Sequence, residues 1–420
     1  MSETKHDCLI IGAGAIGLAC ALALREQGRE VTVLESVAAG AGASHGNCGT
    51  ITPSHAPPLN EPRTLWKGLK WMFKPDAPFH LAPRFDPPLW GWLLRFAKVA
   101  LSPRRRHAIE RQRAALLLAS RRLLPDWLAA LGIDCGFRAS GVLYVFGSEA
   151  GLRRAAAWPE RLAPLGIEAE AWDAQRAMAE EPLLTPRVKG AVLFPGDACL
   201  RPERFVTGLA CAAKARGVVL REGLGIAALE RDGRTLHALD ANGGRHRAEL
   251  IVLAAGARAP ALLAPLGVRL PIQPGKGYSR TYPPLPAMPS RPLVLAERSV
   301  CVTAWPEGLR LGSTMEFSGF SEYLNDRRLA ALERGAFEYL RWDGLPRPQE
   351  SWYGFRPMTP DELPLIGPVP AFPNLMLATG HGMLGISLAA VTGRLVAALA
   401  CHSEPPVDPL PLSPARFLSR

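Results

Sequence analysis

The sequence predicts an α/β protein in which a parallel-sheet domain is assembled from separate stretches of chain and a second, α+β domain is inserted between them. A short apolar strand runs through a glycine-rich loop into a helix at the start of the chain, and a similar strand–glycine–helix unit stands near its end. The long region between them passes from Trp- and Arg-rich helices to patterns typical of a mixed or antiparallel sheet.

The composition is that of a globular protein with a moderate basic excess. The 420 residues are 48% hydrophobic and 21% charged, and the net charge is +11. This excess suits an anionic substrate or an anionic membrane surface, and since no nucleic-acid motif follows, nucleic acid is not an expected partner. The 8 cysteines are isolated, so we expect no metal site and a reducing compartment. Glu3 and Asp7 precede the first apolar run, so no signal peptide is expected, and the sequence favours a cytoplasmic protein.

The opening stretch, "CLIIGAGAIG", predicts a loop that binds a dinucleotide. Gly12 permits a tight turn, Gly14 lets the backbone approach a pyrophosphate, and Gly17 lets the following helix pack against the strand. The next strand, "EVTVLE", ends in Glu35, which is placed to accept hydrogen bonds from ribose hydroxyls. An acid at this position favours NAD or FAD over NADP, whose additional phosphate it would repel.

Three later stretches favour FAD. Residues 40–53, "GAGASHGNCGTITP", form an irregular segment whose backbone N–H groups suit a second pass along the cofactor, although an ordinary surface loop remains the alternative. A strand ending at Gly256 completes the domain after the insertion. Near the end, "GHGMLG" leads into a long helix from about Ile386. The N-terminus of such a helix would stabilise an anionic reduced flavin, whereas core packing around a sharp turn is the alternative.

Taken in order, these stretches resemble the D-amino-acid oxidase superfamily of FAD enzymes, and within it the bacterial D-amino-acid dehydrogenase branch. The resemblance covers nearly the whole chain and rests on "IIGAGAIG", "VTVLE", "IVLAAGARA", "GKGYS", "GFRPMTPDELPLIG" and "TGHGMLG". It implies a Rossmann-like FAD-binding domain of the GR2 type, with the flavin at the interface to the substrate domain. The cofactor contacts that it implies, together with the loop glycines, are Gly12, Gly14, Ala15, Ile16, Gly17, Glu35, Ser36, Ser44, Asn47, Cys48, Gly49, Thr50, Ile226, Gly256, Gly380, Gly382, Met383, Leu384, Gly385 and Ile386.

Two residues depart from the family pattern. His45 stands where this branch commonly has an apolar residue, and it lies one position away from the histidine that carries a covalent flavin in dimethylglycine-dehydrogenase-like relatives. No cysteine occupies the position at which the sarcosine-oxidase branch tethers its flavin, so we expect non-covalent FAD. Glu362 replaces the glycine often seen in the "TPDG" turn.

The substrate side of the site is expected around "GFRPMTPDELPLIG". Prolines fix the backbone around Arg356, and a planar guanidinium binds both oxygens of a carboxylate. In the family this arginine clamps the carboxylate of the amino acid, while a surface ion pair is the alternative reading of the residue alone. Tyr278 resembles the tyrosine of the dehydrogenases' "KGYS" and would bond the carboxylate or shape the pocket. His381 would contact the cofactor or relay a proton. Weaker pocket candidates are His55, Thr303, Trp305 and Tyr353.

The implied reaction is FAD-dependent oxidative deamination of a D-amino acid or D-imino acid, with D-proline and D-hydroxyproline among the candidates. The nearest alternative is a glycine- or sarcosine-type oxidase, and a non-catalytic flavoprotein subunit is an alternative of another class. The electron acceptor is expected to be a quinone or another carrier, with oxygen left open.

The domain boundaries expected from the sequence are 1–60, 196–268 and 352–410 for the FAD-binding domain, and 61–195 and 269–351 for the substrate domain. Within the latter, 61–130 is a basic helical insertion that contains Trp66, Trp71, Trp90 and Trp92, and its stretch "LWGWLLRFAKVAL" predicts an amphipathic helix that Pro103 ends. Aromatic and basic residues combine in this way in helices that lie on a membrane surface, so peripheral membrane contact is one reading, and helices packed on the substrate domain are the other.

Overall fold

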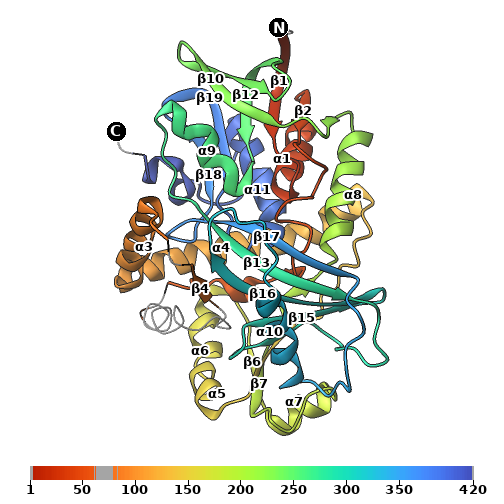
Figure 1. Ribbon diagram of the computed structural model, residues 1–420. Coiled ribbons are helices and arrows are strands. Elements are labelled where there is room, and N and C mark those ends of the chain that lie inside the picture. The colour runs from red at the N-terminus through yellow and green to blue at the C-terminus, as the bar shows by residue number, and fades with distance from the viewer. Residues whose placement is uncertain (1–2, 61, 63–78, 83, 419–420) are drawn as a thin grey trace.

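The computed structural model describes residues 3–60, 62, 79–82 and 84–418. The first of two large sheets occupies one end of the molecule, where both chain termini lie, and the second extends from the middle to the other end (Figure 1). A small two-stranded sheet of β3 (Thr50–Ile51) and β8 (Ala198–Cys199) lies apart from both. This arrangement confirms the predicted mixed α/β fold.

The first sheet is parallel at its centre. β1 (Glu3–Ile11) pairs in parallel with β2 (Val31–Leu34) on one side and with β12 (Arg245–Leu253) on the other. The buried ends of these strands are continuous apolar runs, as expected when both faces of a parallel sheet are covered. The remaining strands of this sheet are β9 (Val219–Arg221), β10 (Ile226–Asp232), β11 (Thr235–Asp240), β18 (Leu365–Val369) and β19 (Phe372–Thr379).

Two apolar helices pack closely on this sheet. α1 (Ala15–Glu26) lies against α11 (Gly385–Ala400), and a Cβ at Gly393 would stand 2.4 Å from the carbonyl oxygen of Ala19. Only glycine permits this approach. α8 (Pro202–Ala215) also contacts α1, and the short α9 (Ala259–Leu263) follows β12.

The second sheet is mostly antiparallel and mixed at two pairs, since β14 runs parallel to β5 and β4 parallel to β16. Its strands are β4 (Phe79–Leu81), β5 (Val142–Phe146), β6 (Glu170–Asp173), β7 (Gly190–Phe194), β13 (Gln273–Tyr282), β14 (Leu293–Leu295), β15 (Val300–Trp305), β16 (Gly308–Phe317) and β17 (Glu350–Met358). The helices around it are α5 (Glu149–Ala155), α6 (Trp158–Leu162), α7 (Ala174–Glu180) and α10 (Asp326–Phe337).

One predicted domain boundary falls inside a strand. β17 pairs with β13 from Glu350 to Met358, so the strand that carries Arg356 belongs to the second sheet. The boundary expected at residue 352 therefore cuts a ladder of backbone hydrogen bonds, which sequence patterns do not reveal.

The basic insertion divides between two environments. α3 (Pro87–Ala100) forms as the apolar pattern predicts, but Pro103 opens the next helix, α4 (Pro103–Leu131), at its first turn, where the missing N–H is not needed. The apolar side of α4 packs against α11 and joins the hydrophobic core of the first sheet, rather than the substrate domain as expected. Trp66 and Trp71 lie outside the described residues. Among the described helices, none combines the length and the apolar character that crossing a membrane requires.

Candidate functional site

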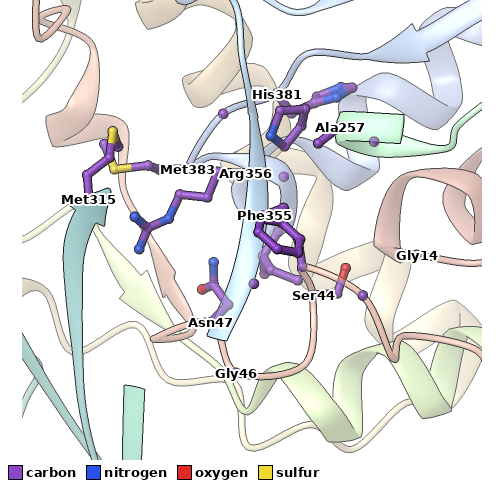
Figure 2. A pocket seen from close by; sticks show the side chains of 18 of the residues that line it. Gly14, Ser44, Gly46, Asn47, Ala257, Met315, Phe355, Arg356, His381 and Met383 are labelled. Atoms are coloured by element: carbon purple, nitrogen blue, oxygen red, sulfur yellow. The ribbon is translucent and has the colours of Figure 1, made fainter. Parts of the chain in front are cut away.

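A cavity of about 1450 Å³ lies where the two sheets meet. Its walls come from the loop after β1, the end of β2, the segment 41–50, the turn after β12 and the start of α11, together with β15, β16 and β17 of the second sheet. Figure 2 shows this convergence: β17 passes between the side chain of Arg356 on one side and that of Phe355 on the other. Segments far apart in the sequence thus enclose one site.

The N-terminus of α1 opens into this cavity. Gly12 has φ +106°, a conformation that favours glycine, and a Cβ at Gly17 would stand 1.9 Å from the carbonyl oxygen of Gly12. Gly14 precedes the helix without a side-chain cap of its own. The hydroxyl of Ser44 instead accepts a hydrogen bond from the N–H of Ala15 at 3.2 Å. The remaining N–H groups of the first turn face the cavity, where an anionic phosphate would be stabilised.

The carboxylate of Glu35 is held at the end of β2. Its Oε2 accepts a hydrogen bond from the N–H of Ala13 at 2.7 Å, and its Oε1 accepts from Ser36 Oγ at 3.0 Å and from the N–H of Val37 at 3.2 Å. Glu35 and Ser36 both line the cavity. A carboxylate fixed in this way keeps free lone pairs for a ribose hydroxyl pair.

The segment 44–50 is fixed by an arginine of the second sheet. Arg310 of β16 is buried and donates to the carbonyl oxygens of His45 at 3.2 Å and of Asn47 at 2.8 Å. The guanidinium also pairs with the carboxylates of Glu203 and Glu350. This network therefore ties the cofactor-side loop to the substrate-side sheet.

The side chain of His45 points away from the cavity. Its Nε2 lies 2.7 Å from Glu350 Oε1, and the hydrogen bond with this carboxylate raises the pKa of His45. His45 does not line the cavity, whereas its neighbours Ser44 and Gly46 do. The ligand atoms of His45, Glu203 and Glu350 lie within 4.8 Å of one another, but the guanidinium of Arg310 already supplies positive charge there.

A second helix N-terminus faces the cavity at α11. Gly382, Met383, Gly385 and Ile386 line it, and the first turn of α11 carries no acidic residue and no side-chain cap. His381 lies just before this turn, and its Nε2 is 3.0 Å from Thr392 Oγ1. Burial lowers the pKa of His381 to about 3, so the ring is neutral.

Arg356 presents a partly buried guanidinium to the cavity. Its Nη1 donates to the carbonyl oxygen of Thr314 at 2.6 Å, and the guanidinium lies flat against Gly277, where a Cβ would stand 2.3 Å from Nη2. Within the described part of the chain, no carboxylate forms an ion pair with Arg356. Burial lowers the pKa of this group, although arginine stays charged. A partly buried cation without a counter-ion among the described residues favours an anionic ligand over the surface ion pair considered from the sequence.

Tyr278 lies on the other face of the second sheet. Neighbouring residues of a strand point to opposite faces, and the guanidinium of Arg356 covers Gly277. The hydroxyl of Tyr278 donates to Glu316 Oε2 at 3.0 Å, and burial raises the pKa of Tyr278. Tyr278 lines the cavity, but its hydroxyl is directed to Glu316 rather than to the side where Arg356 lies.

Most of the other residues expected from the sequence line the cavity. This group consists of Gly12, Gly14, Ala15, Ile16, Ser44, Asn47, Cys48, Thr50, His55, Ile226, Gly256 and Tyr353. Among the described residues, the expected positions that do not line it are Gly17, Gly49, Thr303, Trp305, Gly380 and Leu384.

Packing explains why Gly17, Gly49, Thr303 and Trp305 do not line the cavity. Gly17 and Gly49 lie against backbone, since a Cβ at Gly49 would stand 2.0 Å from the carbonyl oxygen of Leu200. Thr303 is fully buried and its Oγ1 is 3.7 Å from the sulfur of Cys301, whereas Trp305 stacks with Arg310. His55 lines the cavity with a pKa lowered to about 4 by burial.

The sequence reasoning missed the β15–β16 wall of the cavity. Cys301, Ser313, Thr314 and Met315 line it, and Ser313 (φ 113°) and Thr314 (φ 56°) adopt positive φ at a bulge in the strand pairing. The side chains of Met315 and Met383 flank Arg356 in Figure 2. The β-rich pattern of this region indicated a strand, but not which face of the strand meets the cavity.

The cavity fits a flavin dinucleotide. Two helix N-termini without acidic residues, an acid at the end of β2 and a glycine-rich segment all face one elongated space. Gly12–Ile16 and Glu35 would hold the pyrophosphate and the ribose, and Gly382–Ile386 would hold the ring.

Comparisons with known proteins agree with this geometry. Residues 7–399 match the model of the DAO family, described as FAD dependent oxidoreductase. A D-amino acid dehydrogenase from Methylobacterium nodulans is 34% identical over 98% of this chain and 99% of its own, and one from Paramagnetospirillum magneticum is 36% identical over 93% of this chain and 94% of its own. The fold is similar to that of glycine oxidase from Geobacillus kaustophilus, with TM-score 0.77, 24% identity and coverage of 99% and 100% of the two chains. The chain therefore belongs to the DAO family of FAD-dependent oxidoreductases, and its cofactor is FAD.

Proposed function

We propose that this protein is a D-amino acid dehydrogenase that oxidises the Cα–N bond of its substrate to an imine, which water then hydrolyses to a keto acid. When bound, FAD supplies the electron chemistry of this reaction. The relatives named D-amino acid dehydrogenase cover almost the whole chain and support this assignment.

The observation that carries the proposal is the guanidinium of Arg356. It is partly buried, lines the cavity, is oriented by the carbonyl oxygen of Thr314, and has no carboxylate partner in the described part of the chain. The two oxygens of an amino-acid carboxylate match its fork of donors and would neutralise its charge. Arg356 would thus fix the substrate by its acid group and leave the Cα–N bond to face the ring.

The remaining groups of the site would orient the cofactor and the substrate and would exclude water. Because burial lowers the pKa of His381 to about 3, its ring is a weak base, so it would position the cofactor rather than accept a proton from the substrate. Met315 and Met383 flank Arg356 and give the substrate side chain an apolar surface. The hydroxyl of Tyr278 is directed to Glu316, so Tyr278 would shape the wall of the pocket instead of binding the carboxylate.

The orientation of His45 supports non-covalent FAD. Its ring is turned to Glu350, away from the cavity. Acid precipitation of the yellow protein should therefore release all of the flavin into the supernatant. Flavin that stays with the protein pellet would contradict this part of the proposal.

The substrate is tested by anaerobic bleaching of the bound flavin. A panel of D-amino acids, including D-proline and D-hydroxyproline, should bleach the visible absorbance of the flavin, while the L-enantiomers leave it unchanged. Bleaching by glycine or sarcosine alone would indicate the oxidase alternative, and no bleaching by any amine would indicate a docking subunit. The peroxide yield in air then separates an oxidase from a dehydrogenase that passes electrons to a quinone or another carrier.

We also propose that α3 places the enzyme on the inner face of the cytoplasmic membrane, near a quinone acceptor. Phe85, Trp90, Leu94 and Leu101 are exposed on and around α3. Trp90, Leu94 and Leu101 follow one another at helical spacing, and Arg95, Lys98 and residues 104–106 supply positive charge beside them. An apolar stripe flanked by basic residues suits an anionic lipid surface.

A further inference from the structure

Two cysteine thiols meet on the wall of the cavity. Cys48 comes from the cofactor-side segment and Cys301 from β15, and both line the cavity. The sulfur of Cys48 occupies the space above Gly312, since a Cβ built on Gly312 would lie 2.5 Å from it. Gly312 is the direct cross-strand neighbour of Cys301, so the sulfur of Cys48 rests beside the side chain of Cys301. The two thiols interact through a side-chain hydrogen bond.

The surroundings make the two thiols unequal. The hydrogen bond with Cys301 lowers the pKa of Cys48, and the guanidinium groups of Arg310 and Arg356 add to this effect. The same hydrogen bond, together with burial, raises the pKa of Cys301. Cys48 is therefore the better nucleophile, and Cys301 retains its proton.

We propose that Cys48 and Cys301 form a redox-active dithiol that hydrogen peroxide converts to a disulfide. The Cys48 thiolate attacks one oxygen of the peroxide and the O–O bond breaks. The departing hydroxide takes up the proton that the Cys48 thiol had released and leaves as water. The sulfur of Cys301 then attacks the Cys48 sulfenic acid, the S–O bond breaks, and a second water leaves. Two thiols lose two electrons in total and one peroxide gains them.

The other thiols of the chain offer contrasts. Burial raises the pKa of Cys8 to about 12 and that of Cys135 to about 11, so both are poor nucleophiles. Cys211 is exposed on α8, so we expect peroxide to oxidise it directly. Oxidation of Cys211 therefore serves as the internal reference with which disulfide formation between Cys48 and Cys301 is compared.

The disulfide would connect the two sides of the site. Its sulfurs must approach to about 2.0 Å, closer than a thiol hydrogen bond allows. The segment that holds Asn47 and Thr50 would move with Cys48, and both residues line the cavity. Oxidation should therefore lower turnover, and reduction should restore it.

The test uses the FAD-loaded protein, hydrogen peroxide, alkylation of free thiols and tryptic digestion. Cys48 and Cys301 fall in separate peptides, residues 30–63 and 299–310, each with a single cysteine. We expect these peptides to be joined after oxidation and to separate after dithiothreitol, with a parallel loss and recovery of turnover. In Cys301→Ser, no joined peptide should form, and Cys48 should be trapped as sulfenic acid by dimedone.

The matched control is Cys211→Ser, which should form the joined peptides as the unmodified protein does. The proposal is overturned if Cys48 and Cys301 both remain alkylated at a peroxide concentration that oxidises Cys211, or if Cys48 joins a different cysteine. Each variant is compared with its own untreated rate. Because the peptide result requires no substrate, it is independent of the proposed D-amino acid activity.

Discussion

Arg113 and Glu362 form a buried ion pair, with Nη1 and Oε2 separated by 2.9 Å. Arg113 also donates to the carbonyl oxygens of His55 and Ala56, and Glu362 accepts from the N–H of Asn60. Glu362 has φ 58°, the left-handed conformation that favours glycine. The chain thus keeps a glutamate in a strained turn because its carboxylate compensates the buried guanidinium.

The first prediction concerns this pair. Glu362→Gly relieves the backbone strain but leaves Arg113 buried without its counter-ion, which should lower the free energy of unfolding by about 3–5 kcal/mol. Urea denaturation of the FAD-loaded protein measures the loss. The double variant Arg113→Met with Glu362→Gly should recover most of it, and an unchanged stability of the single variant would show that the pair contributes little.

The second prediction concerns Arg356. Arg356→Leu should keep the flavin spectrum and lower kcat/KM for the D-amino acid by a factor that corresponds to about 2–5 kcal/mol. Arg356→Lys should retain an intermediate value, because lysine keeps the charge without the bidentate fork. Arg394→Leu is the control, because Arg394 of α11 pairs with Glu26 of α1 and neither residue lines the cavity. Wild-type kinetics in Arg356→Leu would reject the carboxylate clamp.

The third prediction separates Tyr278 from the substrate. Because its hydroxyl donates to Glu316, Tyr278→Phe should lower the free energy of unfolding by about 1 kcal/mol and leave KM unchanged. Steady-state kinetics and urea denaturation of the same preparation measure the two quantities. A large rise in KM with unchanged stability would instead place the hydroxyl on the substrate.

The fourth prediction concerns pH. Burial raises the pKa of Asp197 from 3.8 to about 7, while hydrogen bonds from Ser54 oppose the shift. Between pH 3.8 and about pH 7, Asp197 holds a proton in the folded protein that it has lost in the unfolded chain. The free energy of unfolding therefore falls as the pH rises through this range, and above it the contribution of Asp197 no longer changes. Asp197→Asn should therefore stabilise the protein more at pH 8 than at pH 5. The exposed Glu404 provides the control Glu404→Gln, which should show no such difference.

The fifth prediction concerns the exposed stripe of α3. Leu94→Glu should reduce co-sedimentation with phosphatidylglycerol vesicles, because a carboxylate replaces an apolar contact beside anionic lipid. Val219→Glu changes an exposed apolar residue on β9 of the first sheet and should bind as the unmodified protein does. Equal binding by both variants would remove α3 from the membrane contact.

Local patterns predicted the parts of the site that depend on local geometry. The loop at Gly12, the acid at Glu35 and the helix start near Gly385 follow from strand, turn and helix signals within short stretches. The face of the second sheet on which the Tyr278 side chain lies could not be predicted, because a shift of one residue in the strand pairing moves every side chain to the opposite face. That no carboxylate among the described residues pairs with Arg356 also depends on contacts between distant segments.

The helices of the insertion show a similar limit. The pattern identified α3 as amphipathic, but it could not show that α4 packs on α11 in the core of the first sheet. The apolar face of a helix indicates that it is buried, not what it is buried against. The boundary within β17 was misplaced for the same reason.

The network around Arg310 has a mechanical consequence. A motion that separated the two sheets would pull this guanidinium from the loop carbonyls and from the carboxylate of Glu203 on α8. Hinge opening of the whole molecule would thus leave the buried charge of Arg310 without several of its partners, which is costly. Product should therefore depart through small local movements of the enclosing segments, with the two halves of the enzyme remaining joined throughout the cycle.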